Sequence, residues 1–254
     1  MKTFRLIFLI FLIAAPAFSA DIRSGEDLIA AMHKKYSSKW YKTLTFVQKT
    51  ITHKPDGTNE IATWYEAMTL PGKLRIDIAP SESGNGILFA DGKIFSFRDG
   101  KAGPGRPFIH PLMVLGFDAY LQPVDVTIGQ LKEMKIDLAT VHETDWQGKR
   151  VYVVGAKQGD LKSPQFWIEK KDLLFVRLLQ PTGKDRASTS DTQFNKYVKV
   201  KGGGWIAPEV LFFVDGRPTM TEEYSDIQAG MELSPDLWNP EKWMSVDKSY
   251  YKPK

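Results

Sequence analysis

The residues of this 254-residue chain that could do chemistry are few and scattered. Its four histidines, His33, His53, His110 and His142, contain no pair at i and i+4 spacing, and the chain has no cysteine. Zinc sites are usually built from cysteine and histidine pairs at short, regular spacing. We therefore expect no metal site, and we expect these histidines to be ordinary surface or hydrogen-bonded residues.

Two short motifs match known sites only in their spacing. Ser245 and Lys248 have the Ser-x-x-Lys spacing of a penicillin-binding nucleophile, but the companion Ser-Asp-Asn element is missing and the motif lies in a polar tail. The glycine-rich segment 100–105 lacks the lysine pattern of a phosphate loop. Neither motif supports a nucleophile or a nucleotide site.

Adjacent acids do not form a catalytic pair either. Glu222 and Glu223 lie in an expected strand, where neighbouring side chains point to opposite faces. Because no nucleophile, base and orienting group occur at recognisable spacing, the sequence predicts that the protein is not an enzyme and needs no cofactor. An enzyme would gain support if the fold brought His110 or His142 together with carboxylates in a cleft.

The N-terminal segment has the three parts of an export signal. Lys2 and Arg5 form a basic start, residues 6–15 are an apolar run too short to span a bilayer, and small residues follow up to Ala20. We expect a signal peptide over 1–19, with cleavage after residue 19 or 20. The mature chain is then expected in the periplasm.

The mature chain is close to electrically balanced. Without Lys2 and Arg5 it has 32 basic residues against 30 acidic ones, which gives no indication of nucleic-acid binding. The absence of cysteine excludes a disulfide and a lipid-acceptor residue after the leader. No Pro/Ser/Gly-rich linker divides residues 20–254, so we expect a monomer with one domain and a C-terminal tail.

The hydrophobic periodicity predicts a helix followed by a long antiparallel meander. Over 24–36 the apolar residues recur at three- and four-residue spacing behind a capping Ser24. From residue 43, apolar or alternating runs are separated by turn signals such as Asp91-Gly92. We expect short helices at 111–117 and 127–132, a loop at 100–107, and strands at 43–54, 60–69, 73–79, 86–91, 93–98, 134–144, 149–157, 164–170, 173–181, 190–201, 205–215 and 218–227.

Some expected strands are apolar on both faces. Residues 86–89 and 173–176 have no polar side, whereas Leu74 and Ile76 alternate with polar neighbours. A sheet that is apolar on both sides needs two covers, and the expected helices can supply one. Either the sheet curls onto the helices, or its concave face is left for an apolar ligand.

Three motifs follow one another in a fixed order behind the export signal: Phe46-x-Gln48-Lys49, Leu70-Pro71-Gly72-Lys73-Leu74-Arg75 and Asp91-Gly92-Lys93-x-Phe95-x-Phe97. Through them the chain resembles the LolA/LolB-like superfamily of periplasmic lipoprotein carriers, by motif over 24–99 and by strand order beyond residue 134. The resemblance implies a mainly β (α+β) fold. Its architecture is an unclosed antiparallel β-barrel, or strongly curved sheet, with helices as a lid over a hydrophobic cavity.

One motif position departs from that family. Its lipoprotein carriers have an arginine immediately before the turn proline, which holds the lid shut, whereas Leu70 precedes Pro71 here. The chain also continues past a minimal carrier, with an extra hairpin over 205–227 and an apolar tail. It therefore resembles the broad group of outer-membrane lipoprotein-sorting proteins rather than the lipoprotein carrier itself.

Apolar strand residues form the expected ligand-binding set, although each of them could instead simply fill the core beneath the helices. Nine are expected on the concave face of the sheet: Met68, Leu74, Ile76, Phe89, Phe95, Phe166, Ile168, Leu179 and Phe213. Four are expected on the inner side of the lid, where flexible side chains adapt to an acyl chain: Leu112, Met113, Leu115 and Phe117.

The sequence therefore predicts a carrier or binding protein for lipoproteins, lipids or other acylated or hydrophobic ligands in envelope transport. Such a carrier would meet a transient partner protein at the inner or outer membrane. The alternative is a protein-interaction module, either an envelope sensor or an accessory of an export machine, whose cavity is filled by its own side chains.

Overall fold

The computed structural model describes residues 21–251, so the signal peptide expected over 1–19 lies outside the described residues. The strands are β1 Thr43–His53, β2 Asn59–Thr69, β3 Lys73–Ile78, β4 Gly86–Ala90, β5 Lys93–Arg98, β6 Lys101–Ala102, β7 Arg106–Pro107, β8 Val141–Trp146, β9 Lys149–Val154, β10 Gln165–Glu169, β11 Leu174–Thr182, β12 Ser188–Asn195, β13 Val198–Lys199, β14 Trp205–Ile206, β15 Glu209–Val214 and β16 Arg217–Ala229. The helices are α1 Gly25–Tyr36, α2 Pro111–Gly116 and α3 Val124–Glu133.

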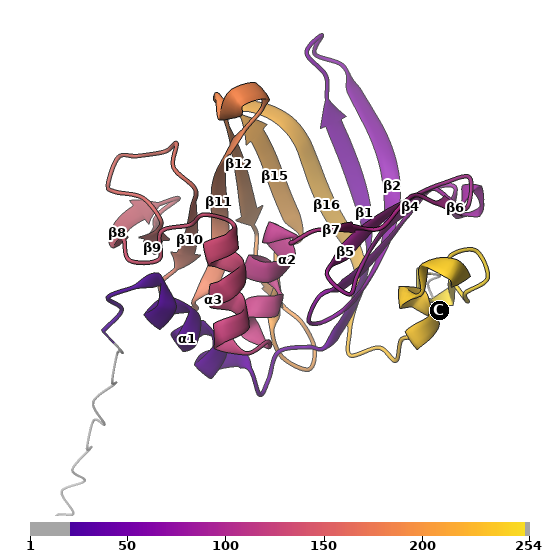
Figure 1. The fold of residues 1–254 in the computed structure, drawn as a ribbon, viewed down its shortest axis with the longest axis horizontal. Coiled ribbons are helices and arrows are strands. Elements are labelled where there is room, and N and C mark those ends of the chain that lie inside the picture. Colours follow the sequence, from indigo (N-terminus) through magenta and orange to yellow (C-terminus); the bar gives the residue numbers. More distant parts are fainter. Residues whose placement is uncertain (1–20, 252–254) are drawn as a thin grey trace, which may run out of the picture.

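Most of these strands belong to one large sheet. Fourteen of them pair in the order β6-β5-β4-β3-β2-β1-β16-β15-β12-β11-β10-β9-β8, with β7 also on β5, while β13 and β14 form a small separate sheet. The path ends at β6 and β8 without joining, so the large sheet is open. Figure 1 shows that it curves strongly, with all three helices inside the curve. The expected mainly β fold is confirmed.

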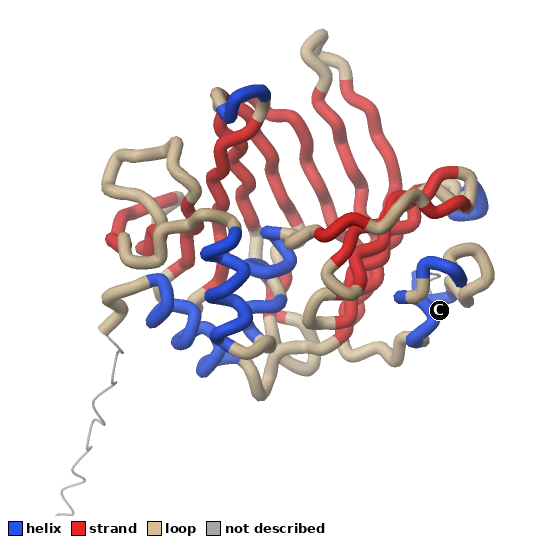
Figure 2. The backbone as a smooth tube through the Cα atoms, viewed as in Figure 1, coloured by secondary structure: helices blue, strands red, loops and turns tan. Residues whose placement is uncertain are grey.

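The helices fill only part of the concave face. In Figure 2 they lie over its lower part, while the strands β1, β2, β15 and β16 extend past them. Around the helices, Trp40 and Tyr120 stack at 3.9 Å between ring centroids, and the Tyr120 hydroxyl accepts a hydrogen bond from the Phe175 N–H of β11. The helical layer is thereby fixed to the sheet at one end of the curve.

Helix α1 begins where its sequence predicts. The Ser24 side-chain oxygen accepts a hydrogen bond from the Asp27 N–H at 3.1 Å, which satisfies one of the free donors of the first turn. The acidic Glu26 and Asp27 lie in that same turn, where the helix dipole favours negative charge. Its apolar side is buried against the core by Leu28, Ile29, Met32 and Tyr36.

Replacing Ser24 with alanine is expected to lower the free energy of unfolding by about 1 kcal/mol, because the cap hydrogen bond is lost. Urea denaturation measures the change. Ser37, beyond the other end of α1, is a matched control, because its backbone N–H rather than its side chain bonds to the His33 carbonyl. A Ser37→Ala change should stay within about 0.5 kcal/mol, and equal effects at both sites would contradict a capping role.

Several expected boundaries are wrong for local reasons. The strand expected at 134–144 starts only at Val141, because Asp137 accepts hydrogen bonds from the Ala139 N–H and the Thr140 hydroxyl and so forms a turn. The strand expected at 190–201 stops at Asn195, since Lys196 has a φ of 59°. Conversely, the loop expected at 100–107 contains β6 and β7, both paired with β5.

The C-terminal tail supplies the second cover that a sheet apolar on both faces requires. It contains three short 3-10 helices, Pro235–Trp238, Pro240–Lys242 and Ser249–Tyr251. Figure 1 shows this segment outside the curve, on the opposite side of the sheet from the helices. Its buried residues pack with outward-facing residues of β2, β4 and β5 in one cluster: Ala67, Leu88, Ala90, Phe97, Leu237, Trp238, Trp243 and Tyr250.

A buried ion pair lies beneath this tail. On β3, the Arg75 Nε and one terminal nitrogen donate to the two carboxylate oxygens of Asp77 at 2.7 and 3.0 Å, and both residues are fully buried. Burial raises the pKa of Asp77, but the hydrogen bonds and charge of Arg75 outweigh burial, so that the pKa lies below its usual value. Asp77 is therefore ionised in the folded protein.

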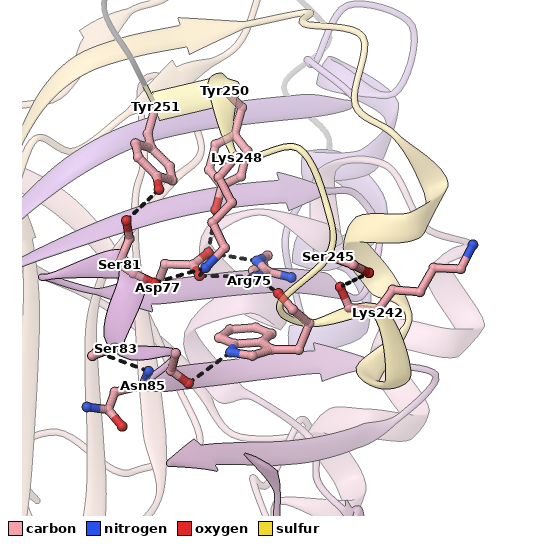
Figure 3. Close-up of polar contacts among 12 residues, drawn as sticks. Arg75, Asp77, Ser81, Ser83, Asn85, Lys242, Ser245, Lys248, Tyr250 and Tyr251 are labelled. Atoms are coloured by element: carbon pink, nitrogen blue, oxygen red, sulfur yellow. Dashed lines mark hydrogen bonds and ion pairs between the residues drawn. The ribbon is translucent and has the colours of Figure 1, made fainter. Parts of the chain in front are cut away.

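The tail supplies further partners to this pair, as Figure 3 shows. Arg75 donates a further hydrogen bond to the Trp243 carbonyl oxygen at 2.8 Å and lies 3.7 Å from the centroid of the Trp243 ring. The Lys248 ammonium lies 2.9 Å from one Asp77 oxygen, and the Tyr250 hydroxyl donates to the other at 2.7 Å. The tail is thus held by charge and by stacking as well as by apolar contact.

Candidate functional site

A cavity of about 270 Å³ lies between α2 and the concave face of the sheet. This volume is near the lower end of the roughly 300–1,000 Å³ typical of small-molecule sites. The lining is mostly apolar and comes from both halves of the sheet, from α2 and from the residues that flank it: Phe46, Gln48, Trp64, Glu66, Met68, Leu74, Ile76, Ile87, Phe89, His110, Leu112, Met113, Phe117, Phe194, Phe212, Met220, Glu222 and Tyr224.

Seven of the thirteen residues expected at the site meet at this cavity. Four come from the sheet and three from the lid segment: Met68, Leu74, Ile76, Phe89, Leu112, Met113 and Phe117. Strict alternation on β2 and β3 brings the sheet members to one face, since Met68 lies opposite Leu74 in the register of the two strands. Their place at the cavity supports a role in ligand binding, which remains a proposal.

Three further expected residues face the same core but do not reach the cavity. Phe166, Ile168 and Leu115 are fully buried and pack within the main hydrophobic cluster. They lie on β10 and at the end of α2, where the helices cover the sheet directly. For these residues the structure agrees with the alternative that they fill the core.

The remaining three, Phe95, Leu179 and Phe213, were expected on the concave face and are not there. Phe95 packs against the tail cluster outside the curve, whereas its neighbour Ile94 packs on the inner core. Leu179 belongs to a separate outer cluster with Trp167. In each case the residue next to the expected one faces inward.

A bulge explains one of these errors. On β11 the register shifts beside Val176, so that Phe175 and Leu178 face inward and Leu179 faces outward. One extra residue moves every following side chain to the other face, which counting by twos from the sequence cannot detect. Phe213 was misplaced without a bulge on its own strand: β15 pairs with β12 in regular register, and Val210 and Phe212 face inward.

Several lining residues were missed because they are polar or come from strands whose register was unknown. Gln48 lies in a recognised motif but was not assigned a role, and Glu66, Glu222 and Tyr224 were not assigned to a site. Alternation along β16 is the signal that could have found the last two, since residues 220, 222 and 224 share one face.

The two acids are the most unusual members of the lining. Glu66 is only 5% exposed, its carboxyl group makes no hydrogen bond among the described residues, and its cross-strand neighbours are the apolar Phe46 and Ile76. Burial, and then the nearby charge of Glu222, raise the pKa of Glu66 well above its usual value. The Glu66 carboxyl group is thus held in an apolar wall that disfavours its charged form.

Glu222 is also buried, at 9% exposure. Burial raises its pKa to about 7, although the Tyr224 hydroxyl, which donates to its carboxylate at 2.6 Å, and the neighbouring Gln48 amide act in the opposite direction. Glu223, one residue along, is exposed and paired with Lys49, so the expected alternation of these two acids is confirmed.

His110 lines the same cavity as Glu66 and Glu222, the arrangement that the sequence analysis named as support for an enzyme. Its Nδ1 accepts a hydrogen bond from the Met113 N–H at the start of α2, and its ring contacts Phe89 edge-on at 4.7 Å. Burial lowers its pKa to about 4, so the imidazole is neutral. Within residues 21–251 no hydrogen bond or ion pair joins His110 to Glu66 or Glu222.

Comparison with solved structures places this arrangement in a known architecture. A domain named as an outer membrane lipoprotein-sorting protein from Vibrio parahaemolyticus superposes with a TM-score of 0.57, over 87% of this chain and 98% of its own, at 10% identity. The fold of this chain is LolA-like. A LolA superfamily protein from Nitrosomonas europaea has a TM-score of 0.51 at 10% identity, covering 83% of this chain and 96% of its own.

A DUF1329 family protein from Desulfovibrio piger has the same LolA-like fold, with a TM-score of 0.55 at 15% identity over 84% of this chain and 95% of its own. No sequence profile of a known protein family matches the chain, and no curated protein matches it in sequence. The likeness at these identities concerns the fold. The sequence resemblance to LolA-like proteins is confirmed at that level.

The lid of this LolA-like fold is connected to the sheet without the family's arginine. Leu70, which stands in its place, is buried in the main core. The Gly72 N–H of the same turn instead donates a hydrogen bond at 3.1 Å to Asp118, just after α2. Burial raises the pKa of Asp118 to about 7. The turn and the lid are therefore linked by a main-chain donor and one buried acid.

Two further observations concern metal-binding groups and membrane-spanning helices. Among residues 21–251 there is no group of three or more histidine, aspartate or glutamate side chains placed to hold a metal ion. In the same range no helix is long and apolar enough to cross a membrane.

Proposed function

We propose that this protein is a periplasmic carrier or binding protein for lipids, lipoproteins or other acylated ligands. The observation that carries the proposal is the apolar cavity of about 270 Å³ between the sheet and α2, which the side chains of the protein leave unfilled. A cavity filled by its own side chains would instead favour the interaction module. Binding rather than catalysis is supported by the mostly apolar lining of the cavity.

The size of the cavity suits part of one acyl chain rather than a whole multi-chain lipid. Burying such a chain removes apolar surface from water, at about 25 cal/mol per Å², and needs no specific polar contact along its length. Leu112 and Met113 of α2 lie on the lid side of the cavity, and both are unbranched at Cβ and can adjust their rotamers to different chains. The rest of the ligand would stay outside, in water or on a partner.

The proposal includes the cellular location of the protein and the kind of partner that it meets. The export signal at 1–19 would deliver residues 20–254 to the periplasm as one soluble domain with its tail folded onto the sheet. A carrier of this kind receives its ligand from one membrane and releases it at another, so it needs transient contact with an inner- or outer-membrane protein. The names of two structural neighbours, a lipoprotein-sorting domain and a LolA superfamily protein, agree with this role.

Native mass spectrometry of protein purified from envelope extracts tests the proposal directly. A co-purified lipid or acylated molecule is expected, and the uncharged fluorophore N-phenyl-1-naphthylamine should bind with increased fluorescence and be displaced by an uncharged single-chain amphiphile such as 1-dodecanol. Absence of both the co-purified ligand and saturable probe binding would contradict it.

Two adjacent phenylalanines on β15 give a matched pair of variants. Phe212 and Phe213 are both half-buried, but only Phe212 lines the cavity. A Phe212→Gln change is expected to weaken probe binding at least about tenfold, because it replaces apolar wall with an amide that has no partner there. Fluorescence titration measures the dissociation constant.

The Phe213→Gln variant is the control, with the same chemistry on the opposite face of the same strand. It should bind the probe within about twofold of the wild-type protein, with circular dichroism confirming that both variants are folded. Equal weakening in the two variants would mean that the probe does not bind in this cavity.

A further inference from the structure

The cavity contains one carboxyl group, that of Glu66, to which the described residues supply no donor. An ionised carboxylate offers about four acceptor positions. Glu66 has no hydrogen bond among the described residues, even though it is 95% buried and lines the cavity. Native proteins rarely leave such a group unpartnered, since the desolvation cost is then not offset. The missing donor is therefore expected from outside the chain.

The register of the sheet places no donor side chain directly opposite Glu66. Glu66 projects from the middle of β2, and the residues directly opposite it are Phe46 on β1 and Ile76 on β3, both in the wall of the same cavity. No lysine or arginine is among the residues that line it. The polar and titratable groups that face the cavity are Gln48, Glu66, His110, Glu222 and Tyr224, of which none is a cation under neutral conditions.

The second acid, Glu222, indicates which charge the polar end of a ligand should carry. Glu222 lies near enough to Glu66 for each added negative charge to be disfavoured. A ligand carboxylate or phosphate in this wall would add a third acid to two buried ones, whereas an ammonium would supply donors and neutralise charge together. Aromatic faces beside Glu66, those of Phe46 and Trp64, are also favourable surroundings for a cation.

We propose that the cavity selects single-chain amphiphiles whose polar end is a protonated amine, with the ammonium group bound by Glu66 and supported by Glu222, and with the chain along the apolar wall. This inference rests on the proposed function and narrows its ligand class. Binding is also coupled to protons, because an ammonium favours the ionised form of Glu66, and any proton that this carboxyl group holds in the empty cavity is released to the solvent.

Three amphiphiles of equal chain length separate the contributions of charge and chain. Dodecylamine, 1-dodecanol and dodecanoate are titrated at pH 7 against bound N-phenyl-1-naphthylamine, each below its micelle concentration. Dodecylamine is expected to bind about 30-fold or more tightly than dodecanoate, with 1-dodecanol between them. Calorimetry in two buffers of different ionisation enthalpy should show proton release for dodecylamine alone.

The variant Glu66→Gln removes the charge with little change of shape. It is expected to reduce the preference for dodecylamine over dodecanoate to less than about threefold, while 1-dodecanol, which tests the cavity itself, binds as before. Glu223→Gln is the matched control, because that acid is exposed on the opposite face of β16. This control should keep the full preference.

The outcomes distinguish the two levels of the proposal. If all three amphiphiles bind the wild-type protein equally, or if Glu66→Gln keeps the amine preference, the amine-selective site is wrong while the carrier function stands. If neither the probe nor any amphiphile binds, the carrier function itself is wrong. Preference for dodecanoate would overturn the assignment of charge.

Discussion

Replacing Arg75 with methionine is expected to lower the free energy of unfolding by about 3–5 kcal/mol. Arg75 and Asp77 are both fully buried, and the guanidinium holds both carboxylate oxygens. Methionine fills similar space but leaves the Asp77 charge with only Lys248 and Tyr250 as partners, and it removes the contact with the Trp243 ring. Urea denaturation followed by tryptophan fluorescence measures the loss.

Two controls identify the cause. The ion pair between Lys49 and Glu223 is about half exposed. A Lys49→Met change should therefore lower the free energy of unfolding by at most about 1 kcal/mol. The double change Arg75→Met with Asp77→Leu should recover most of the loss, because it removes the unpaired charge as well. Limited proteolysis should cut Arg75→Met first in the C-terminal tail. A stable single variant with a protected tail would contradict this role of the pair.

This cluster also explains why the tail was not recognised as a structural element. The sequence shows that strands such as 86–89 are apolar on both faces and that two covers are needed. It gives no sign of which distant segment provides the second cover. Trp243 meets Arg75 across 168 residues, and only the folded chain reveals that the tail closes the outer face.

The fold class was predictable because each signal was local. The cap at Ser24, the apolar side of α1 and the turns at Asp91 and Asp215 depend on neighbours a few residues away. Both of these aspartates have positive φ, as two-residue hairpin turns require. Most neighbouring strands follow one another along the chain, but the pairing of β16 with β1 and of β15 with β12 joins strands that the sequence does not place side by side.

The site was only partly predictable, because its lining depends on the register of strands that are far apart in the sequence. The residues on β2 and β3 were placed correctly because these strands alternate without a bulge. Leu179 was misplaced because a bulge lies just before it, and Phe213 because the face of β15 that turns inward could not be chosen from its mostly apolar sequence. The raised pKa of Glu66 could not be predicted, since it arises from burial between neighbouring strands and from the charge of Glu222, 156 residues away.

Glu222 leads to the second large effect, a pH-dependent gain in stability when it is changed to glutamine. Its pKa is about 7 in the folded protein and near 4.5 in the unfolded chain. Below pH 4.5 both states are protonated and the carboxyl group makes no difference. Between pH 4.5 and 7 the unfolded chain has lost the proton that the folded protein retains, so stability falls as the pH rises. Above pH 7 both states are ionised and the cost is constant.

The Glu222→Gln variant removes this cost. Relative to the wild-type protein, it should gain about 3 kcal/mol in unfolding free energy between pH 4 and pH 8, with the gain developing between pH 4.5 and 7. Glu66 acts in the same direction, because removal of its negative neighbour brings its own pKa closer to the usual value. Urea denaturation at a series of pH values, taken as the difference between the two proteins, cancels groups that are common to both.

The exposed Glu223→Gln variant should show a difference that is small and independent of pH, which separates the buried site from the general loss of one charge. If the difference in unfolding free energy between Glu222→Gln and the wild-type protein did not change with pH, the Glu222 carboxyl group would be solvated and its pKa would not be raised. A gain of the expected size would mean that the empty cavity destabilises the protein at neutral pH. Binding sites often destabilise the folded protein in this way, because their charged groups are placed to bind a ligand rather than to stabilise the fold. An amine bound at Glu66 would offset the loss of stability.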